Sequence, residues 1–270
     1  MSDPVNSTEL YPFGADYLYF CTKAAELTGI NLHNYKGKQM YRRLVNYMNR
    51  RNIPDFATFA LRLQRDPDEL SRFVDYLTIN VSEFFRNREH WEVLAEKVVP
   101  LLVDQAKWRI RVWSAGSAAG QETYSAAITF AERSLNDVFV LGTDIDEMSL
   151  SKARAGKYTA SEAKNVPQHL LDKYFRKEDD LYVVKDSIRQ IVSFRRHDLL
   201  SSEYPGNMDL IICRNVLIYF SEQSKRDVIT RLSASLRSGG VLFMGATEAI
   251  FNAKDYDLTQ IFPFFYRRTL

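Results

Sequence analysis

The stretch Arg109-Ile-Arg-Val-Trp-Ser-Ala-Gly-Ser-Ala-Ala-Gly-Gln-Glu122 decides the fold of this chain. It starts as a short apolar run typical of a buried strand, passes through a loop of small residues, and ends in a helical pattern. Further apolar runs alternate with helical patterns, at residues 138–142, 191–194, 208–213 and 240–244. This succession predicts an α/β fold with a Rossmann-like, doubly wound parallel sheet. Ligands of such sheets bind at the carboxyl ends of the strands, where the strand order reverses.

The loop after the first strand indicates the kind of ligand. Its small residues allow a ligand close to the backbone, but the spacing of Gly116 and Gly120 is not that of a dinucleotide fingerprint. Glu122 in the first helical turn suits the helix dipole, which is its ordinary explanation. That carboxylate would also repel a pyrophosphate bound at the same helix end. A cofactor with a positive or neutral centre near this loop fits the carboxylate better. S-adenosylmethionine, with its sulfonium and amino groups, is such a cofactor.

Two acids follow the second strand, in the segment Thr143-Asp144-Ile-Asp146. An acid at this strand tip is well placed to accept the hydroxyls of a ribose. Either aspartate can alternatively cap the helical pattern of residues 147–154. We expect Asp144 to bind the ribose and Asp146 to cap the helix.

The first 78 residues are predicted to form a separate helical domain, with a linker that extends to about residue 90. Its most informative segment is residues 38–51, where Met40, Tyr41, Leu44, Val45 and Met48 share one helical stripe. Between residues 34 and 65 there are eight Lys or Arg and one acid, Asp55, a balance of +7. A solvated helix face is the ordinary explanation, but such faces usually mix signs. The lopsided charge favours a docking surface for an acidic partner.

The second predicted domain, residues 79–270, is interrupted at residues 158–190. A short helical pattern at 167–175 precedes an alternating run at 181–185. This pattern predicts a small insertion that contains an antiparallel β-ribbon.

The composition excludes several classes of protein. Lys plus Arg is 36 and Asp plus Glu is 34, and this near-balance argues against a nucleic-acid coat protein. The two cysteines, Cys21 and Cys213, are too few for a disulfide framework, and four scattered histidines predict no metal site. There is no signal peptide pattern and no apolar run of membrane-spanning length. We expect a cytoplasmic monomer that does not insert into membranes.

Four segments together resemble one family. They are Asn80-Val-Ser-Glu-Phe-Phe-Arg86, residues 112–125, Thr143-Asp-Ile-Asp146 and Ile212-Cys-Arg-Asn-Val-Leu-Ile-Tyr-Phe220. In this order and spacing they are similar to the CheR family of chemotaxis receptor methyltransferases, over nearly the whole chain. The resemblance implies transfer of a methyl group from S-adenosylmethionine to glutamates on the cytoplasmic helices of methyl-accepting chemoreceptors.

The resemblance also implies site residues. Asp198 stands where many relatives have asparagine, and its carboxylate is expected to accept the adenine amino hydrogen. Tyr219 matches the family tyrosine near the transferred methyl, and Arg86 and Arg214 are its expected catalytic companions. The implied cofactor contacts are Asn80, Ser82, Arg86, Ala115, Gly116, Glu122, Asp144, Ile145, Asp198, Leu199, Cys213, Arg214 and Asn215. The implied receptor-docking residues are Lys38, Arg42, Arg43 and Arg50.

Two other functions remain open. One is a regulatory module that senses S-adenosylmethionine without catalysis, and the other is an RNA methyltransferase. Asn215 is followed by Val-Leu-Ile-Tyr rather than by the Pro-Pro-Tyr/Phe of nucleic-acid amino methyltransferases. The β-ribbon of some family members binds a receptor C-terminal pentapeptide through a glycine-containing loop. Here residues 175–181 lack glycine and carry three consecutive acids, so we expect methylation without that pentapeptide.

Overall fold

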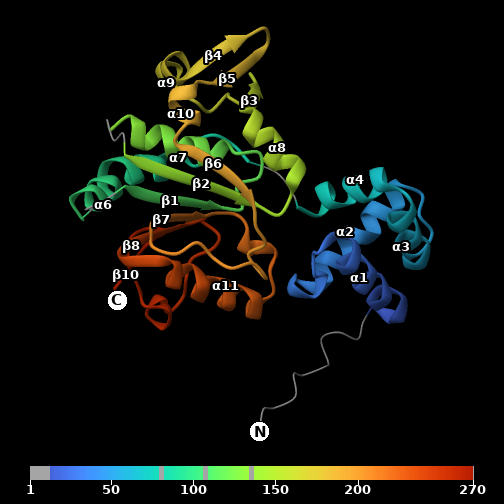
Figure 1. Cartoon of the computed structure of the whole chain (residues 1–270). Coiled ribbons are helices and arrows are strands. Elements are labelled where there is room, and N and C mark those ends of the chain that lie inside the picture. The colour runs from blue at the N-terminus through green and yellow to red at the C-terminus, as the bar shows by residue number, and fades with distance from the viewer. Residues whose placement is uncertain (1–12, 79–81, 106–108, 134–136, 270) are drawn as a thin grey trace. The chain divides into compact units, whose positions relative to one another are not determined.

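The computed structural model describes residues 13–78, 82–105, 109–133 and 137–269. The chain divides into two compact units (Figure 1). The first comprises residues 1–79 and 219–225, and the second comprises residues 80–218 and 226–270. The predicted linker region includes residues 79–81, which lie outside the described residues.

The first unit is built from helices. They are α1 (Gly14–Thr28), η1 (Leu32–Asn34), α2 (Gly37–Arg50), α3 (Phe56–Arg65) and α4 (Pro67–Thr78). Fully buried aromatic rings fill its centre: Phe20 stacks on Phe59 with ring centroids 4.6 Å apart, and Phe73 meets Phe59 edge-on at 5.1 Å. Asp55 begins α3 as an N-cap, because its carboxylate accepts the Thr58 N–H at 2.7 Å.

One buried carboxylate ties α2 to α4 in this unit. Glu69 accepts a hydrogen bond from the Tyr47 hydroxyl at 2.7 Å and from the Arg51 guanidinium at 2.6 Å. The Arg51 hydrogen bond holds the pKa of Glu69 below its ordinary value. Tyr47 was missing from the predicted apolar stripe, but in the structure it is buried while Tyr41 and Val45 are only half-buried.

The segment of residues 219–225 joins the helical unit through its backbone. The Lys36 N–H donates to the Tyr219 carbonyl at 3.0 Å, and the Ser221 N–H donates to Asn34 at 2.8 Å. Between these two bonds, Tyr35 and Phe220 form an isolated antiparallel bridge. The motif that contains Tyr219 therefore starts in the second unit and ends in the first.

The second unit contains a seven-stranded sheet in the order β6-β2-β1-β7-β8-β10-β9 (Figure 1). The strands are β1 (Ile110–Ala115), β2 (Val138–Asp144), β6 (Val192–Arg196), β7 (Met208–Cys213), β8 (Leu236–Met244), β9 (Leu258–Phe262) and β10 (Phe265–Arg268). The first five in this list pair in parallel, and β10 is antiparallel to both its neighbours. The predicted Rossmann-like α/β fold is confirmed. The two C-terminal strands were not predicted.

Helices connect the parallel strands. α7 (Gln121–Ala131) links β1 to β2 and packs on both, and α8 (Glu147–Ala155) follows β2 and packs on β2 and β6. α11 (Glu222–Ser235) connects β7 to β8. The chain runs from β1 outward to β2 and β6, then returns to β7 and continues to β8 on the other side. The strand order thus reverses between β1 and β7.

A helical segment precedes this sheet, formed by α5 (Arg88–Val93), the π-helical turn η2 (Leu94–Val98) and α6 (Val99–Gln105). Trp91 from α5 packs edge-on against Phe243 of β8, with centroids 5.9 Å apart. The contact fixes the start of α5 against the sheet, next to the segment that contains Arg86.

The predicted antiparallel insertion is confirmed. β3 (Lys157–Thr159), β5 (Leu181–Val184) and β4 (Phe175–Glu178) form a separate three-stranded antiparallel sheet. α9 (Gln168–Tyr174) precedes β4, and α10 (Asp186–Arg189) leads back to the main sheet. The β4–β5 turn is made by Asp179, at φ +50°, and Asp180. The remaining 3-10 turns are η3 (Leu217–Tyr219) and η4 (Ala253–Tyr256).

Among the described residues, no helix has both the length and the apolar character needed to cross a bilayer.

Candidate active site

The small-residue loop after β1 is anchored to the end of β2. The N–H groups of Gly116 and Ser117 both donate to the Thr143 carbonyl at 2.8 Å, and the Ala118 N–H donates to Asp144 Oδ2 at 2.8 Å. A phosphate-binding loop needs such amides for its ligand. Here three successive amides are already engaged, so the geometry agrees with the sequence argument against a dinucleotide.

The two acids of the Asp-Ile-Asp segment have different partners. Asp146 accepts the Met148 N–H at 2.9 Å and is the N-cap of α8, as predicted. Asp144 is buried, and its two oxygens accept the N–H groups of Ala118 and Asp146. Burial raises the pKa of Asp144, and these amides oppose the rise. Each oxygen keeps a second lone pair, which leaves acceptor capacity for hydroxyl groups.

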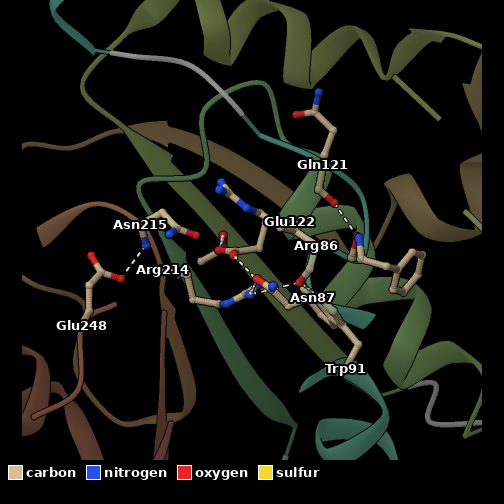
Figure 2. Close-up of polar contacts among 11 residues, drawn as sticks. Arg86, Asn87, Trp91, Gln121, Glu122, Arg214, Asn215 and Glu248 are labelled. Carbon is tan, nitrogen blue, oxygen red and sulfur yellow. Dashed lines mark hydrogen bonds and ion pairs between the residues drawn. The ribbon is translucent and has the colours of Figure 1, made fainter. Parts of the chain in front are cut away.

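Across the point where the strand order reverses, Glu122 pairs with Arg214 (Figure 2). Glu122 comes from the first turn of α7, and Arg214 directly follows β7. Arg214 Nη1 lies 3.5 Å from Glu122 Oε2, and the Ser114 hydroxyl donates to Glu122 Oε1 at 3.0 Å. Burial raises the pKa of Glu122, and the nearby guanidinium groups of Arg214 and Arg86 oppose the rise.

Arg214 is enclosed by the protein. Its side chain is 1% exposed, its guanidinium lies 4.7 Å from the ring centroid of Phe243, and burial lowers its pKa. Arg214 Nη2 also donates to the Arg86 carbonyl at 3.0 Å and to Asn87 Oδ1 at 2.9 Å. This side chain therefore holds the backbone that carries Arg86.

Arg86 lies between two residues in left-handed backbone conformations, Phe85 at φ +48° and Asn87 at φ +60°. Such a conformation costs a bulky residue on the order of 1–3 kcal/mol, so the surroundings must stabilise it. The Phe85 N–H donates to Ser125 Oγ at 3.0 Å, and Trp91 Nε1 donates to the Arg86 carbonyl at 3.1 Å. In contrast to Arg214, the Arg86 side chain forms no ion pair or hydrogen bond with any described residue, and it is half-buried.

Other predicted cofactor residues lie at the same sheet edge. Ala115 and Cys213 end their strands and are buried, and burial raises the pKa of the Cys213 thiol. Asp198 and Leu199 follow β6. The Asp198 carboxylate accepts the Leu200 N–H at 2.8 Å and the Ser201 hydroxyl at 2.7 Å. Both of its oxygens thus stabilise their own turn, which was not expected for an adenine acceptor.

Three further predicted cofactor residues are Asn80, Ser82 and Ile145. Asn80 lies outside the described residues. Ser82 is described and half-buried, and it precedes the Phe85 and Arg86 positions in the same irregular segment. Ile145 is half-buried, between the two aspartates, and its carbonyl accepts a hydrogen bond from Arg196 Nε at 3.2 Å.

The turn after β7 is held by Glu248, a residue that the sequence analysis did not single out. Glu248 is 8% exposed. Its Oε2 accepts the Asn215 N–H at 2.5 Å (Figure 2). Its Oε1 accepts the Leu217 N–H at 2.6 Å. Asn215 has φ +60°. A glutamate after the fifth parallel strand has no distinctive spacing, so only the structure reveals this role.

Tyr219 ends the 3-10 turn η3 (Leu217–Tyr219). It belongs to the first unit, where its side chain lines a small cavity with Tyr35, Met40, Arg43 and other residues of α2 and α4. Its predicted position near the transferred methyl stays a prediction.

The predicted docking residues lie on α2 and differ in their surroundings. Lys38, Arg42 and Arg50 are exposed and form no ion pair with described residues. Arg43 is half-buried: its guanidinium donates to the Tyr76 carbonyl and lies 5.0 Å from the centroid of the Tyr76 ring. Arg43 thus ties α2 to α4 and is less exposed than Lys38, Arg42 and Arg50, and its part in receptor docking stays a prediction.

The donors and acceptors at this edge fit S-adenosylmethionine. Ser117 Oγ and Gln121 Oε1 are buried without a hydrogen-bond partner in the described part of the chain. Buried polar atoms normally have partners, so these two are available to a polar ligand. Glu122 and Asp144 supply acceptors for amino and hydroxyl groups, and Arg86 supplies a cation that has no partner among the described residues.

Three features together define the class of S-adenosylmethionine-dependent methyltransferases. They are the order of the parallel strands, the acid after β2, and the loop amides after β1 that are already hydrogen-bonded within the protein. Two family descriptions then cover almost the whole chain. The CheR methyltransferase all-alpha domain matches residues 15–78, and the CheR methyltransferase SAM binding domain matches residues 80–262. The chain belongs to the CheR methyltransferase family, which confirms the resemblance and the cofactor S-adenosylmethionine.

Relatives along the full length agree with this assignment. The chain is 39% identical to a chemotaxis protein methyltransferase of Listeria innocua, over 94% of this chain and 97% of the relative. It is 32% identical to one of Salmonella typhimurium, over 88% and 85% of the two chains. A solved TehB-like SAM-dependent methyltransferase from Corynebacterium glutamicum is a distant structural likeness, with a TM-score of 0.38 and 14% identity over 67% of this chain and 93% of that chain.

Proposed function

We propose that this enzyme methylates glutamate side chains on the cytoplasmic helices of chemoreceptors and forms glutamyl methyl esters. The observation that carries the proposal is the unpaired guanidinium of Arg86 beside the buried Glu122–Arg214 pair. A substrate carboxylate needs a cation near the cofactor, and Arg86 is the cation there that has no partner among the described residues. The relatives named for chemotaxis support the receptor as the acceptor.

The chemistry requires little acid–base assistance. A glutamate carboxylate has a pKa of about 4.3 in model peptides, so it is already ionised at neutral pH. S-adenosylmethionine supplies an electrophilic methyl on a sulfonium, and its transfer to a carboxylate cancels one positive and one negative charge. The protein's task is then to align the carboxylate and to exclude water.

Arg86 and Arg214 divide this task. Arg86 orients the substrate carboxylate or the carboxylate of the cofactor, because its guanidinium is free to form a bidentate contact. Arg214 positions Arg86 through the Arg86 carbonyl and neutralises Glu122. Since charge is lost as the methyl moves, a tight Arg86 pair would stabilise the substrate more than the transition state. Arg86 therefore acts mainly by alignment, together with Tyr219 as a proposed orienting hydroxyl.

The basic face of α2 is proposed to dock the receptor. Lys38, Arg42 and Arg50 are exposed cations that form no ion pair with a described residue, and the family resemblance implies a glutamate-containing receptor helix as the substrate. Long-range attraction of this kind steers association and weakens with salt.

Receptor binding is also proposed to be independent of a C-terminal pentapeptide. The β4–β5 turn consists of Asp179 and Asp180, and the adjacent Glu178 is ion-paired with Lys157 at 3.1 Å. These two aspartates form no ion pair with a described residue, and their charges would repel a peptide carboxylate. Calorimetric titration with such a pentapeptide tests the point, and micromolar binding would contradict it.

The function is tested by incubating the enzyme and methyl-labelled S-adenosylmethionine with receptor membranes and, in parallel, with tRNA. We expect label on the receptor band that alkali releases as methanol, because carboxylate esters hydrolyse in base. Label on tRNA alone, or alkali-stable label on the receptor, would sink the proposal.

A further inference from the structure

We propose that Glu248 is a positioning residue for the cofactor site: its carboxylate holds the turn after β7 in the conformation that presents Arg214 and Asn215. This inference rests on the proposed function of those residues. It adds a residue that neither the family resemblance nor the comparisons assign.

The contact is built on both carboxylate oxygens. Glu248 Oε2 accepts the Asn215 N–H at 2.5 Å, and Oε1 accepts the Leu217 N–H at 2.6 Å. Backbone amides of the same turn also oppose the rise that burial causes in the pKa of Glu248. Hydrogen bonds to a charged acceptor are about twice as strong as neutral ones. The turn is therefore held by Glu248 rather than by its own sequence alone.

The glycine at the end of β8 makes room for this contact. A side-chain carbon on Gly245 would collide with Glu248 Oε2 and would lie 3.0 Å from the Asn215 amide nitrogen. The Glu248 N–H donates to the Gly245 carbonyl at 3.0 Å, which closes the turn that directs the carboxylate inward. The contact between Glu248 and the turn after β7 therefore depends on Gly245 as well as on Glu248.

The turn held by Glu248 reaches the loop after β1. A side-chain carbon on Gly116 would collide with Val216 Cγ2, so Val216 packs directly on the Gly116 backbone. Asn215 adopts φ +60°, a left-handed conformation that is uncommon for a residue other than glycine. Through Asn215 and Val216, Glu248 sets the relation between the two loops, after β1 and after β7, where the strand order reverses.

If Glu248 only stabilised the fold, its substitution would lower stability without a specific loss of cofactor affinity. The chain offers a matched control for this distinction. Asp209 is also a buried carboxylate: it accepts the Arg111 N–H at 2.7 Å and pairs with Arg237. It lies at the start of β7, at the opposite end of the strand from Arg214. Asp209→Asn therefore disturbs comparable contacts without disturbing the cofactor loops.

The experiment measures S-adenosylhomocysteine binding by calorimetry, and thermal unfolding, for wild type, Glu248→Gln and Asp209→Asn. The glutamine keeps the shape but has one acceptor oxygen, and its NH₂ faces an N–H. We expect Glu248→Gln to raise the Kd of the folded protein about tenfold or more, with kcat lowered and the receptor KM nearly unchanged. Asp209→Asn should lower the unfolding temperature and leave the Kd within about twofold.

Equal Kd values for wild type and Glu248→Gln would overturn the positioning role. If Glu248→Gln does not fold, Gly245→Ala decides, because its methyl group displaces the carboxylate without removing it. We expect the same loss of affinity, and an unchanged Kd would overturn the proposal. Absence of S-adenosylhomocysteine binding by the wild type would instead refute the proposed site itself, so the two failures are distinguishable.

Discussion

The division of roles between the two arginines leads to a sharp prediction for Arg214→Met. Methionine preserves the apolar contact with Phe243 but removes the partner of Glu122 and the donors to Arg86 and Asn87. Breaking a buried ion pair from one side costs about 3–5 kcal/mol, because a charge stays buried without compensation. For a unit of this size that predicts an unfolding temperature lower by about 6–20 °C. Arg86→Met should change stability by less than about 1 kcal/mol and still abolish methyl transfer.

The pH dependence of Arg214→Met provides an independent check. Burial already raises the folded-state pKa of Glu122, and loss of Arg214 should raise it further. A carboxyl whose folded pKa is raised loses stability as the pH increases from its unfolded pKa towards its folded pKa. The stability difference between wild type and Arg214→Met should therefore grow between pH 5 and pH 7, by up to about 1.4 kcal/mol per pH unit.

Urea unfolding of Arg214→Met and Arg86→Met at pH 5 and pH 7 measures these losses of stability. The double variant Arg214→Met/Glu122→Gln serves as the control. Removal of the orphaned carboxylate should restore part of the lost stability, and the stability difference from the wild type should no longer grow with pH. A loss below about 1 kcal/mol for Arg214→Met, or a gap that shrinks with pH, would refute the assignment of Arg214 as the buried positioning cation.

Three further predictions concern the docking face, the helix cap and the cofactor loop. The triple reversal Lys38→Glu, Arg42→Glu and Arg50→Glu should raise the receptor KM about tenfold or more at low salt and leave the Kd for S-adenosylhomocysteine unchanged; a KM that does not depend on ionic strength in the wild type would contradict the docking role. Asp146→Ala removes the N-cap of α8 and should cost about 0.5–2 kcal/mol by urea unfolding with little change in cofactor affinity, whereas a large loss of affinity would assign Asp146 to the ligand. Gly116→Ala places a methyl group against Val216 at φ +78° and should weaken S-adenosylhomocysteine binding in calorimetry, and unchanged affinity would show that the loop tolerates displacement.

Much of the main sheet was predictable, because buried parallel strands are continuous apolar runs. Residues 208–213, for example, form β7 as predicted and are buried on both faces. β9 and β10 escaped prediction for the opposite reason. β9 is the antiparallel edge strand, and its Thr259 and Gln260 are exposed; β10, which lies between β8 and β9, is only four residues long. Neither strand therefore forms a long apolar run.

The sequence predicted those site residues whose place is set by a neighbouring strand or helix. An acid after the second strand and a carboxylate in the first turn of α7 both lie at the expected sheet edge. What the sequence did not disclose depends on long-range contacts. Arg43 and Arg42 are neighbours with the same charge, but only Arg43 reaches Tyr76, 33 residues away. Glu248 likewise binds amides 33 and 31 residues earlier in the chain.

The distinction between Arg86 and Arg214 has the same origin. Both are arginines within recognisable motifs, and their sequence contexts do not separate them. Burial separates them, since the Arg214 side chain is enclosed by Phe243, Trp91 and Glu122. This enclosure requires residues from β8, α5 and α7 to come together. A local sequence pattern cannot predict it, because these elements are far apart along the chain.

The most direct test of the central claim is to locate the transferred methyl on the acceptor. Purified enzyme, S-adenosylmethionine and a chemoreceptor cytoplasmic domain are incubated, and the receptor peptides are sequenced by mass spectrometry at acidic pH, where esters persist. We predict a mass increase of one methylene on glutamate side chains with the wild-type enzyme and none with Arg86→Met. Methylation on lysine, arginine or the backbone amine, or equal glutamate methylation by Arg86→Met, would contradict the account.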